Sequence, residues 1–168
     1  NLSGNLTNVT GKLKISSTGS GIIRLAAGQT YALVIGDSLV VEAGTLDLVS
    51  GAGNSTITVN GHCLQSGGTI TKTGSGAPSV VNFNGDFIQN AGTFEFGIAG
   101  SPTSTVNLKG NLVHNGAITR GSGTGTFNFI KGASGTQTWS QTGGTMSGAV
   151  TWNIGNATTN TVQLLTNV

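Results

Sequence analysis

The residues best suited to chemistry are two acids and a histidine at nearly constant spacing. Asp37, His62 and Asp86 follow one another at almost equal intervals, and each comes directly after a glycine. Two carboxylates and an imidazole held side by side could transfer a proton or bind a metal ion. That chemistry is the sharpest that the sequence offers, because the chain contains only five acidic residues and two histidines.

A simpler interpretation of this position is a polar corner between strands. Asparagine takes the same place after a glycine at Asn5, Asn111 and Asn156. A neutral amide can hydrogen-bond to the backbone at a bend, but it cannot act as an acid or a base. We therefore expect a corner position at Asp37, His62 and Asp86, and we assign no catalytic, metal-binding or cofactor-binding residue.

Other residues permit an alternative function in carbohydrate binding or polysaccharide cleavage. Asp47 and Glu95 share a column two repeats apart, which predicts carboxylates about 9 to 10 Å apart. That separation is at the upper edge of the range for inverting glycoside hydrolases. Aromatic residues make up only 5% of the chain. Three of them are candidate platforms for stacking a sugar: Tyr31, Trp139 and Trp152.

The single cysteine excludes an intramolecular disulfide and a site of several cysteine ligands. Cys63 aligns with Phe87 and Leu112 in an apolar column, so a buried, unreactive thiol is expected. Gln65, Gln89 and His114 align two places further on. They could cap backbone groups near a bend.

These residues align because the sequence repeats. Apolar, polar, apolar, polar, glycine is the order at 57–61, 81–85 and 106–110, so the glycines that close the three segments are almost evenly spaced. No strand pair has the two-residue loop of an antiparallel hairpin, so each strand must pair with its equivalent in the next repeat. The pattern predicts an all-β, right-handed parallel β-helix, a single solenoid domain over 1–168 with about 24 residues per coil and roughly six to seven coils. A second glycine column has the same spacing, at Gly44, Gly68, Gly92 and Gly116.

The repeat predicts which side chains point inward and which outward. Two inward columns are Ile57, Val81, Val106, Phe127, Trp152 and Val59, Phe83, Leu108, Phe129, Ile154, and a second wall holds Leu46, Ile70, Phe94 and Ile118. Amides at strand spacing can hydrogen-bond along the solenoid. The outward column is Thr58, Asn82, Asn107, Asn128 and Asn153.

The period drifts near both ends of the chain. Ile22, Ile23 and Leu25 are too apolar for a free loop, and an added strand is expected there. Residues 133–145 are rich in Gly, Ser, Thr and Gln, so an irregular segment with weaker hydrogen-exchange protection than the central coils is expected. No cap is evident at either end, which favours a piece of a longer solenoid or a subunit that stacks into a fibre.

Composition excludes several kinds of partner. The net charge is only +2, with 7% charged residues and no basic stripe, so no nucleic-acid partner is expected. No run of 18 apolar residues occurs, and hence no membrane insertion is expected. Outward threonines suggest ice binding as another alternative, although in register Thr56 meets Val80 and Thr58 meets Asn82.

The recurring phrase at 4–8, 85–92 and 110–116 resembles the parallel β-helix repeats of large secreted bacterial surface proteins. It is similar to adhesins exported by the type IX route. This resemblance implies a structural or adhesive segment, secreted to the cell surface. The uniform repeat, the low charge and the lack of clustered chemical groups predict no enzymatic activity. Its partners would be neighbouring solenoid segments or identical subunits end to end, with surface glycans as a further class.

Overall fold

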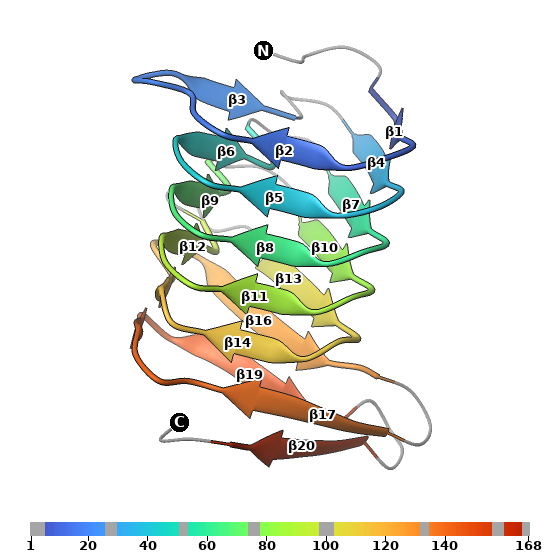
Figure 1. Cartoon of the computed structure of the whole chain (residues 1–168), viewed down its shortest axis with the longest axis vertical. Coiled ribbons are helices and arrows are strands. Elements are labelled where there is room, and N and C mark those ends of the chain that lie inside the picture. Colours follow the sequence, from blue (N-terminus) through green and yellow to red (C-terminus); the bar gives the residue numbers. More distant parts are fainter. Residues whose placement is uncertain are drawn as a thin grey trace.

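Short strands alternate with tight corners in the computed structural model, which describes residues 6–25, 30–50, 54–73, 78–97, 103–131, 135–155 and 160–165. The strands form three parallel sheets that wrap around one core (Figure 1). We name them sheets A, B and C in the order in which the chain passes through them. The part of the chain that the structure describes has no helix long and apolar enough to cross a membrane.

Sheets A and B have seven strands each, and sheet C has six. Sheet A contains β1 (Asn8–Val9), β4 (Tyr31–Ile35), β7 (Ser55–Val59), β10 (Ser79–Phe83), β13 (Thr103–Leu108), β16 (Thr124–Phe129) and β19 (Val150–Ile154). Sheet B contains β2 (Leu13–Ile15), β5 (Leu39–Val41), β8 (Cys63–Gln65), β11 (Phe87–Gln89), β14 (Leu112–His114), β17 (Gly135–Ser140) and β20 (Asn160–Leu164). Sheet C contains β3 (Ile22–Arg24), β6 (Thr45–Asp47), β9 (Thr69–Thr71), β12 (Thr93–Glu95), β15 (Ala117–Thr119) and β18 (Thr145–Ser147).

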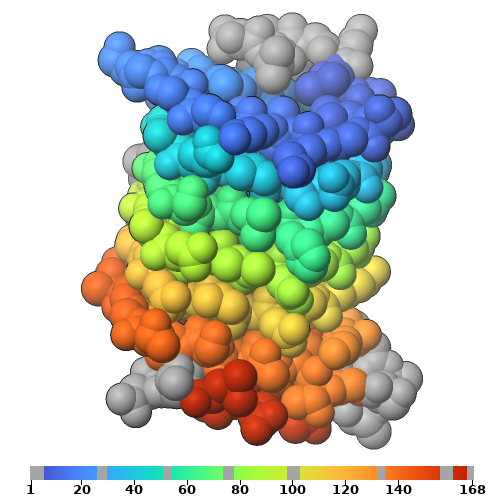
Figure 2. All heavy atoms as spheres, viewed as in Figure 1, coloured from blue at the N-terminus to red at the C-terminus, as the bar shows by residue number. Residues whose placement is uncertain are grey.

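Each coil takes one strand from each sheet, so the described strands make six full coils and two strands of a seventh. The coils follow one another as bands along the molecule (Figure 2), and the winding is right-handed. The predicted fold class, repeat length and number of coils are confirmed. Strands β1 to β3 lie at one end of the stack, and β18 to β20 lie at the other.

The pairing register matches the repeat in the sequence. Val81 pairs with Ile57 on one side and with Val106 on the other. Phe94 pairs in the same way with Ile70 and Ile118. A one-residue slip would turn every apolar side chain of a strand outward, so burial holds the register. The predicted inward columns are therefore confirmed in register, and they are buried except at the last strand, where Ile154 is exposed.

The structure confirms one expectation about the ends and corrects another. Strand β3 pairs with β6 in sheet C, as the apolar residues Ile22 and Ile23 predict. The expectation of an irregular segment is wrong for residues 135–140, because these residues form strand β17, which pairs with both β14 and β20. Gln137 and Trp139 alternate inward along this strand and are buried. Residues 142–144, between β17 and β18, are exposed, so only this part of the expected segment resembles a loop, and residues 133–134 lie outside the described ranges.

The glycine corners are required by close approach between coils. At Gly92, φ is 86°, and a Cβ would lie 2.5 Å from the carbonyl oxygen of Gly68. At Gly85 the backbone is ordinary, yet a Cβ would lie 2.5 Å from the carbonyl oxygen of Gly61. The first case combines conformation and space, whereas the second is a matter of space alone.

We expect Gly92→Ala to lower the free energy of unfolding by about 1 to 3 kcal/mol, because it adds left-handed strain to a backbone clash. Gly143→Ala is the matched control, since nothing lies within 4 Å of a Cβ at that corner. Urea denaturation of both variants measures the difference. Equal stabilities would show that the corners tolerate side chains and would contradict this account.

Candidate functional site

The predicted polar column lies at successive corners between sheets A and B. The Nδ1 atom of His62 accepts the backbone N–H of Asp86 at 3.0 Å and lies 3.5 Å from Asp86 Oδ2. Asp86 Oδ1 in turn accepts the backbone N–H of Asn111 at 2.7 Å. In the coil before, Asp37 Oδ1 accepts the hydroxyl of Ser38 at 3.0 Å.

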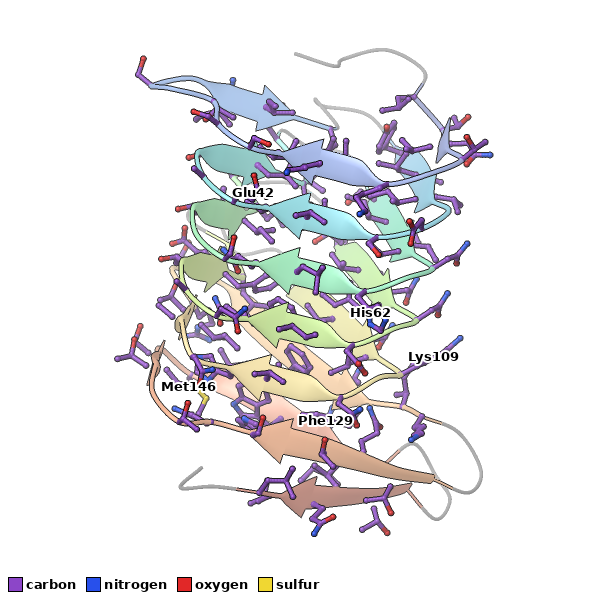
Figure 3. All side chains as sticks on the ribbon, viewed as in Figure 1. Glu42, His62, Lys109, Phe129 and Met146 are labelled. Atoms are coloured by element: carbon purple, nitrogen blue, oxygen red, sulfur yellow. The ribbon has the colours of Figure 1, made fainter. Side chains whose placement is uncertain are left out.

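These contacts are those of corner caps. Each side chain of the set receives a hydrogen bond, and in two cases the donor is the backbone of the next coil. Asp37 and His62 are exposed, and His62 lies at the edge of the stack beside the end of the β7 to β8 corner (Figure 3). Within the described ranges, no group of three or more His, Cys, Asp and Glu side chains is arranged to hold a metal ion.

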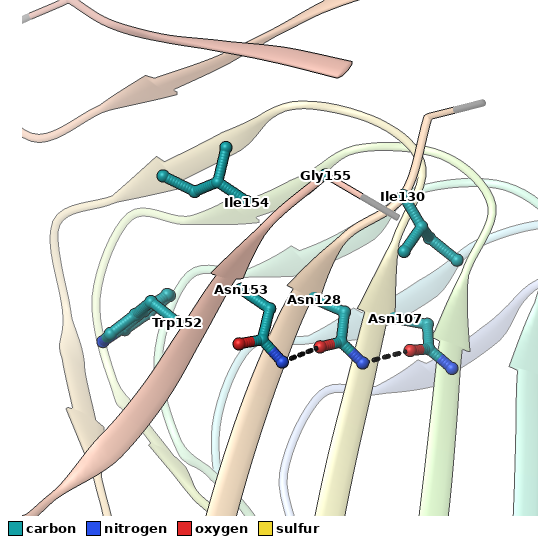
Figure 4. A pocket seen from close by; sticks show the side chains of 7 residues that line it. All are labelled: Asn107, Asn128, Ile130, Trp152, Asn153, Ile154 and Gly155. Atoms are coloured by element: carbon teal, nitrogen blue, oxygen red, sulfur yellow. Dashed lines mark hydrogen bonds between the residues drawn. The ribbon is translucent and has the colours of Figure 1, made fainter. Parts of the chain in front are cut away.

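A ladder of side-chain amides runs along the outer face of sheet A (Figure 4). Asn153 donates to Asn128 and Asn128 donates to Asn107, each at 2.8 Å, and Asn107 donates to Asn82 at 2.9 Å. Asn82 then donates to the hydroxyl of Thr58 at 3.4 Å. Every bond points toward the N-terminal coils, so the amide dipoles are aligned.

The ladder ends in an open hollow of about 460 Å³ at the last strand of sheet A (Figure 4). The amides of Asn107, Asn128 and Asn153 line one side of it. Apolar side chains complete the lining, namely Ile130, Trp152 and Ile154. The hollow therefore joins the polar outer face to the open end of the core.

The carboxylates that could have served a glycoside hydrolase are occupied within the fold. Asp47 is 0% exposed, and its Oδ1 accepts the backbone N–H groups of Val49 at 3.2 Å and Thr73 at 3.1 Å. The hydroxyl of Thr73 donates to Oδ2, and Arg24 lies 3.7 Å from that oxygen. Glu95 accepts the hydroxyl of Thr71 at 3.2 Å. Asp47 thus binds the backbone that follows strands β6 and β9 of sheet C, and it is not exposed to solvent.

The suggested tryptophan platforms belong to the core. Trp139 is 6% exposed, and its ring centroid lies 4.5 Å from that of the half-buried Trp152. Both rings also stack on Phe129, at 5.7 and 6.4 Å. The expectation that Trp139 offers a platform is wrong, because β17 turns this residue inward. Tyr31 is half-buried, and its hydroxyl donates to the carbonyl of Leu6.

The glutamines near the second corner cap backbone groups from inside the core. Gln65 donates to the carbonyl of Thr93 at 2.9 Å, and Gln89 donates to that of Ala117 at 2.9 Å. Gln89 also donates to the side chain of Gln65 at 3.1 Å. The sequence shows the alignment of these amides. It does not show that they are almost fully buried.

Two further buried polar residues escaped the interpretation of the sequence. Gln137 donates to the carbonyls of Leu108 at 3.0 Å and Gly110 at 2.6 Å. Lys72 is 4% exposed at the end of β9, and burial lowers the pKa of its ammonium group. The alternation of Gln137 with Trp139 in the sequence could have predicted that Gln137 points inward. No comparable pattern marks the second.

Cys63 lies in the core with no exposed surface. Burial raises the pKa of its thiol, so the nucleophilic thiolate is disfavoured. Its neighbours along the column are Leu39 and Phe87. The position suits a small apolar side chain.

Comparison of the chain with protein-family models, curated proteins and solved structures finds no match. The arrangement of the strands by itself defines the class of this protein, a parallel β-solenoid of about six coils.

We expect Asn107→Val to lower the free energy of unfolding by about 1 to 2 kcal/mol, since it removes one donated and one accepted ladder bond. Thr105→Val is the matched control. Thr105 lies two places earlier on the same outer face, and valine keeps both the shape and the strand propensity. Urea denaturation of the pair gives the contribution of the ladder, and equal stability would show that the ladder contributes nothing.

His114 predicts a dependence of stability on pH. It is 0% exposed, and burial lowers its pKa, outweighing nearby groups of Gln141, Thr145 and Gly116 that favour the charged form. The unfolded chain takes up a proton below about pH 6.5 and the folded chain does so only at lower pH. The free energy of unfolding should therefore fall as the pH drops below about 6.5.

His114→Gln should remove this component, because glutamine already occupies the same column at Gln65 and Gln89. His62→Gln, at an exposed histidine, should retain it. Thermal melts between pH 7 and pH 5 make the comparison. A slope that survives His114→Gln unchanged would assign the effect to another group.

Proposed function

We propose that this chain is a structural segment of a secreted bacterial surface or filament protein, built to carry a further β-coil on its C-terminal face. The observation that carries this proposal is the end formed by β18, β19 and β20, on which the described residues place no further strand. Each of these is the last strand of its sheet. Each therefore offers a row of backbone groups on its outer edge to another strand.

Apolar side chains on these strands continue the inward columns to the edge. Met146 is 40% exposed, Leu164 is 54% exposed and Ile154 is 57% exposed. Their column neighbours one coil back are Ile118, Trp139 and Phe129, which are buried. A further coil would cover all three, and the hydrophobic gain would be about 25 cal/mol for each Å² of apolar surface removed from water.

The edge also lacks the features that keep sheets apart. No Lys, Arg, Asp, Glu or Pro occurs between 132 and 168. Natural proteins protect exposed edge strands with charges, prolines or bulges, so an edge without charge or proline suits continued pairing. A structural role is also supported by the described columns, whose polar groups bond to one another.

The extracellular, adhesive part of the proposal has separate support. Low charge, many outward Asn and Thr side chains and the absence of reactive thiols suit a surface fibre, as does the resemblance to secreted adhesins. Its partners would be neighbouring solenoid segments or identical subunits end to end, with surface glycans as a further class. No catalytic role is proposed.

The alternatives have narrower support. Carbohydrate cleavage needs exposed carboxylates and carbohydrate binding needs aromatic platforms, but Asp47 and Trp139 are buried. Ice binding has one favourable feature. Thr105, Thr126 and Thr151 pair in register beside the amide ladder. That array covers only three strands, because the next position in the column is Val80.

We expect Ile154→Lys to weaken end-to-end association at least tenfold, since a charge would have to be buried beneath the next coil. Thr56→Lys adds the same charge at an exposed position on the outer face and is the matched control. Sedimentation velocity over a range of concentrations measures association, and electron microscopy checks for rods. Monomers of the unaltered chain at every concentration would refute assembly through this face.

A further inference from the structure

The acceptor at the C-terminal end of the amide ladder indicates which coil binds there. We propose that the C-terminal face binds the N-terminal coil of a second copy of this chain, with β1 pairing parallel to β19 and Asn8 lying beside Asn153. This inference rests on the proposed function, because it names the partner of that face. It adds a register and a direction that a generic stacking surface lacks.

The ladder has a direction, and its C-terminal end is an unfilled acceptor position. Each amide nitrogen donates to the side chain one coil earlier, from Asn153 through to Thr58. The carboxamide oxygens of Asn82, Asn107 and Asn128 each accept one such bond. Asn153 is on the last strand of the sheet. Its Oδ1 is therefore the acceptor that a donor of the next coil would reach. The matching group is an amide N–H in the same column.

Asn8 places that group on the first strand. It pairs with Val34, which pairs with Thr58, so Asn8 belongs to the same column as the ladder. Val34 has no polar side-chain atom and therefore interrupts the ladder between Asn8 and Thr58. Asn8 is exposed. An amide that its own chain cannot bring into the ladder thus stands at one end, and the vacant acceptor stands at the other.

The columns beside the ladder agree with this register. Val9 begins the column that ends at Ile154, through Ile35, and Leu13 begins the column that ends at Leu164, through Leu39. In the first column the carbonyls of Val9, Ile35, Val59, Phe83 and Leu108 each accept an N–H of the following coil, at 2.7 to 2.9 Å. Ile154 holds this carbonyl on β19, and Thr10 of a second copy would supply the N–H.

Like charges do not meet at this contact, although the N-terminal coil carries the exposed Lys12. The C-terminal face has no charged residue from 132 onward. On the N-terminal coil, Lys14 lies 2.8 Å from Glu42, and Arg24 lies 3.7 Å from Asp47. These cations are paired inside their own chain. Apolar columns and one amide then determine the fit.

The register also sets the length of the repeating unit. Sheets A and B have seven strands each, so successive copies would be related by seven coils, a rise of about 34 Å at strand spacing. Sheet C has six strands, which leaves a gap one strand wide between β18 and β3 of the next copy. In this arrangement the second copy covers Ile154 and Leu164 directly, and Met146 on β18 faces the gap. A six-coil repeat would require β1 to occupy the place of β19.

A disulfide between copies tests the register. Neighbouring positions on paired strands have Cα atoms about 4.8 Å apart, which a disulfide can span. In Asn8→Cys combined with Asn153→Cys, oxidation should give covalent multimers that disappear on reduction. Asn8→Cys combined with Thr151→Cys is the matched control, since the two Cα atoms would be about 8 Å apart, beyond disulfide reach. Cys63 is buried in both variants.

We expect at least tenfold more multimer from the first variant than from the control, with a peptide joining positions 8 and 153 in mass spectra. Electron microscopy of the unaltered chain should show filaments with a rise of about 34 Å. Filaments without the 8–153 disulfide, or with another rise, would overturn this inference and leave the proposed function standing. Monomers at every concentration would overturn both.

Discussion

Backbone pairing between successive coils is the constraint on which the rest of this molecule depends. Parallel strands lie about 4.8 Å apart, so each side chain meets the same column one coil before and one coil after. A residue must therefore suit its column as well as its own environment. Gly85 shows this constraint in its simplest form, because a Cβ there would lie 2.5 Å from the carbonyl oxygen of Gly61.

The same constraint decides what polar groups do. A side chain that recurs in every coil finds its partner in the column, as Asn107 does with Asn82 and Asn128. Where the residue type changes, the bond passes to the backbone, as it does from Asn111 to Asp86. Titratable groups that align in the sequence are thereby joined to backbone amides, and their hydrogen-bonding capacity goes into holding coils together.

The sequence predicts most of the fold, because burial and the repeat period act on the same positions. The column of Ile57, Val81 and Val106, the outward asparagines and the added strand at Ile22 all follow from alternation alone. Strand β17 was missed because only two large or long side chains, Gln137 and Trp139, mark its inward face among Gly, Ser and Thr. Asp47 was identified only by the column that it shares with Glu95. Its burial depends on Thr73, which folds back over the carboxylate after the next strand of the sheet.

The aromatic core is confined to one part of the rod. All six phenylalanines and both tryptophans lie between 83 and 152, and ring contacts connect them from Phe83 to Trp152. The buried apolar residues of the coils before β10 are Leu, Ile and Val, together with Cys63. Aromatic side chains bury more surface than these, and each coil of a solenoid is held mainly by its neighbours. The aromatic coils should therefore resist mechanical unfolding better than the aliphatic coils. A pulling force would unfold the aliphatic coils first, while tryptophan emission remained unchanged.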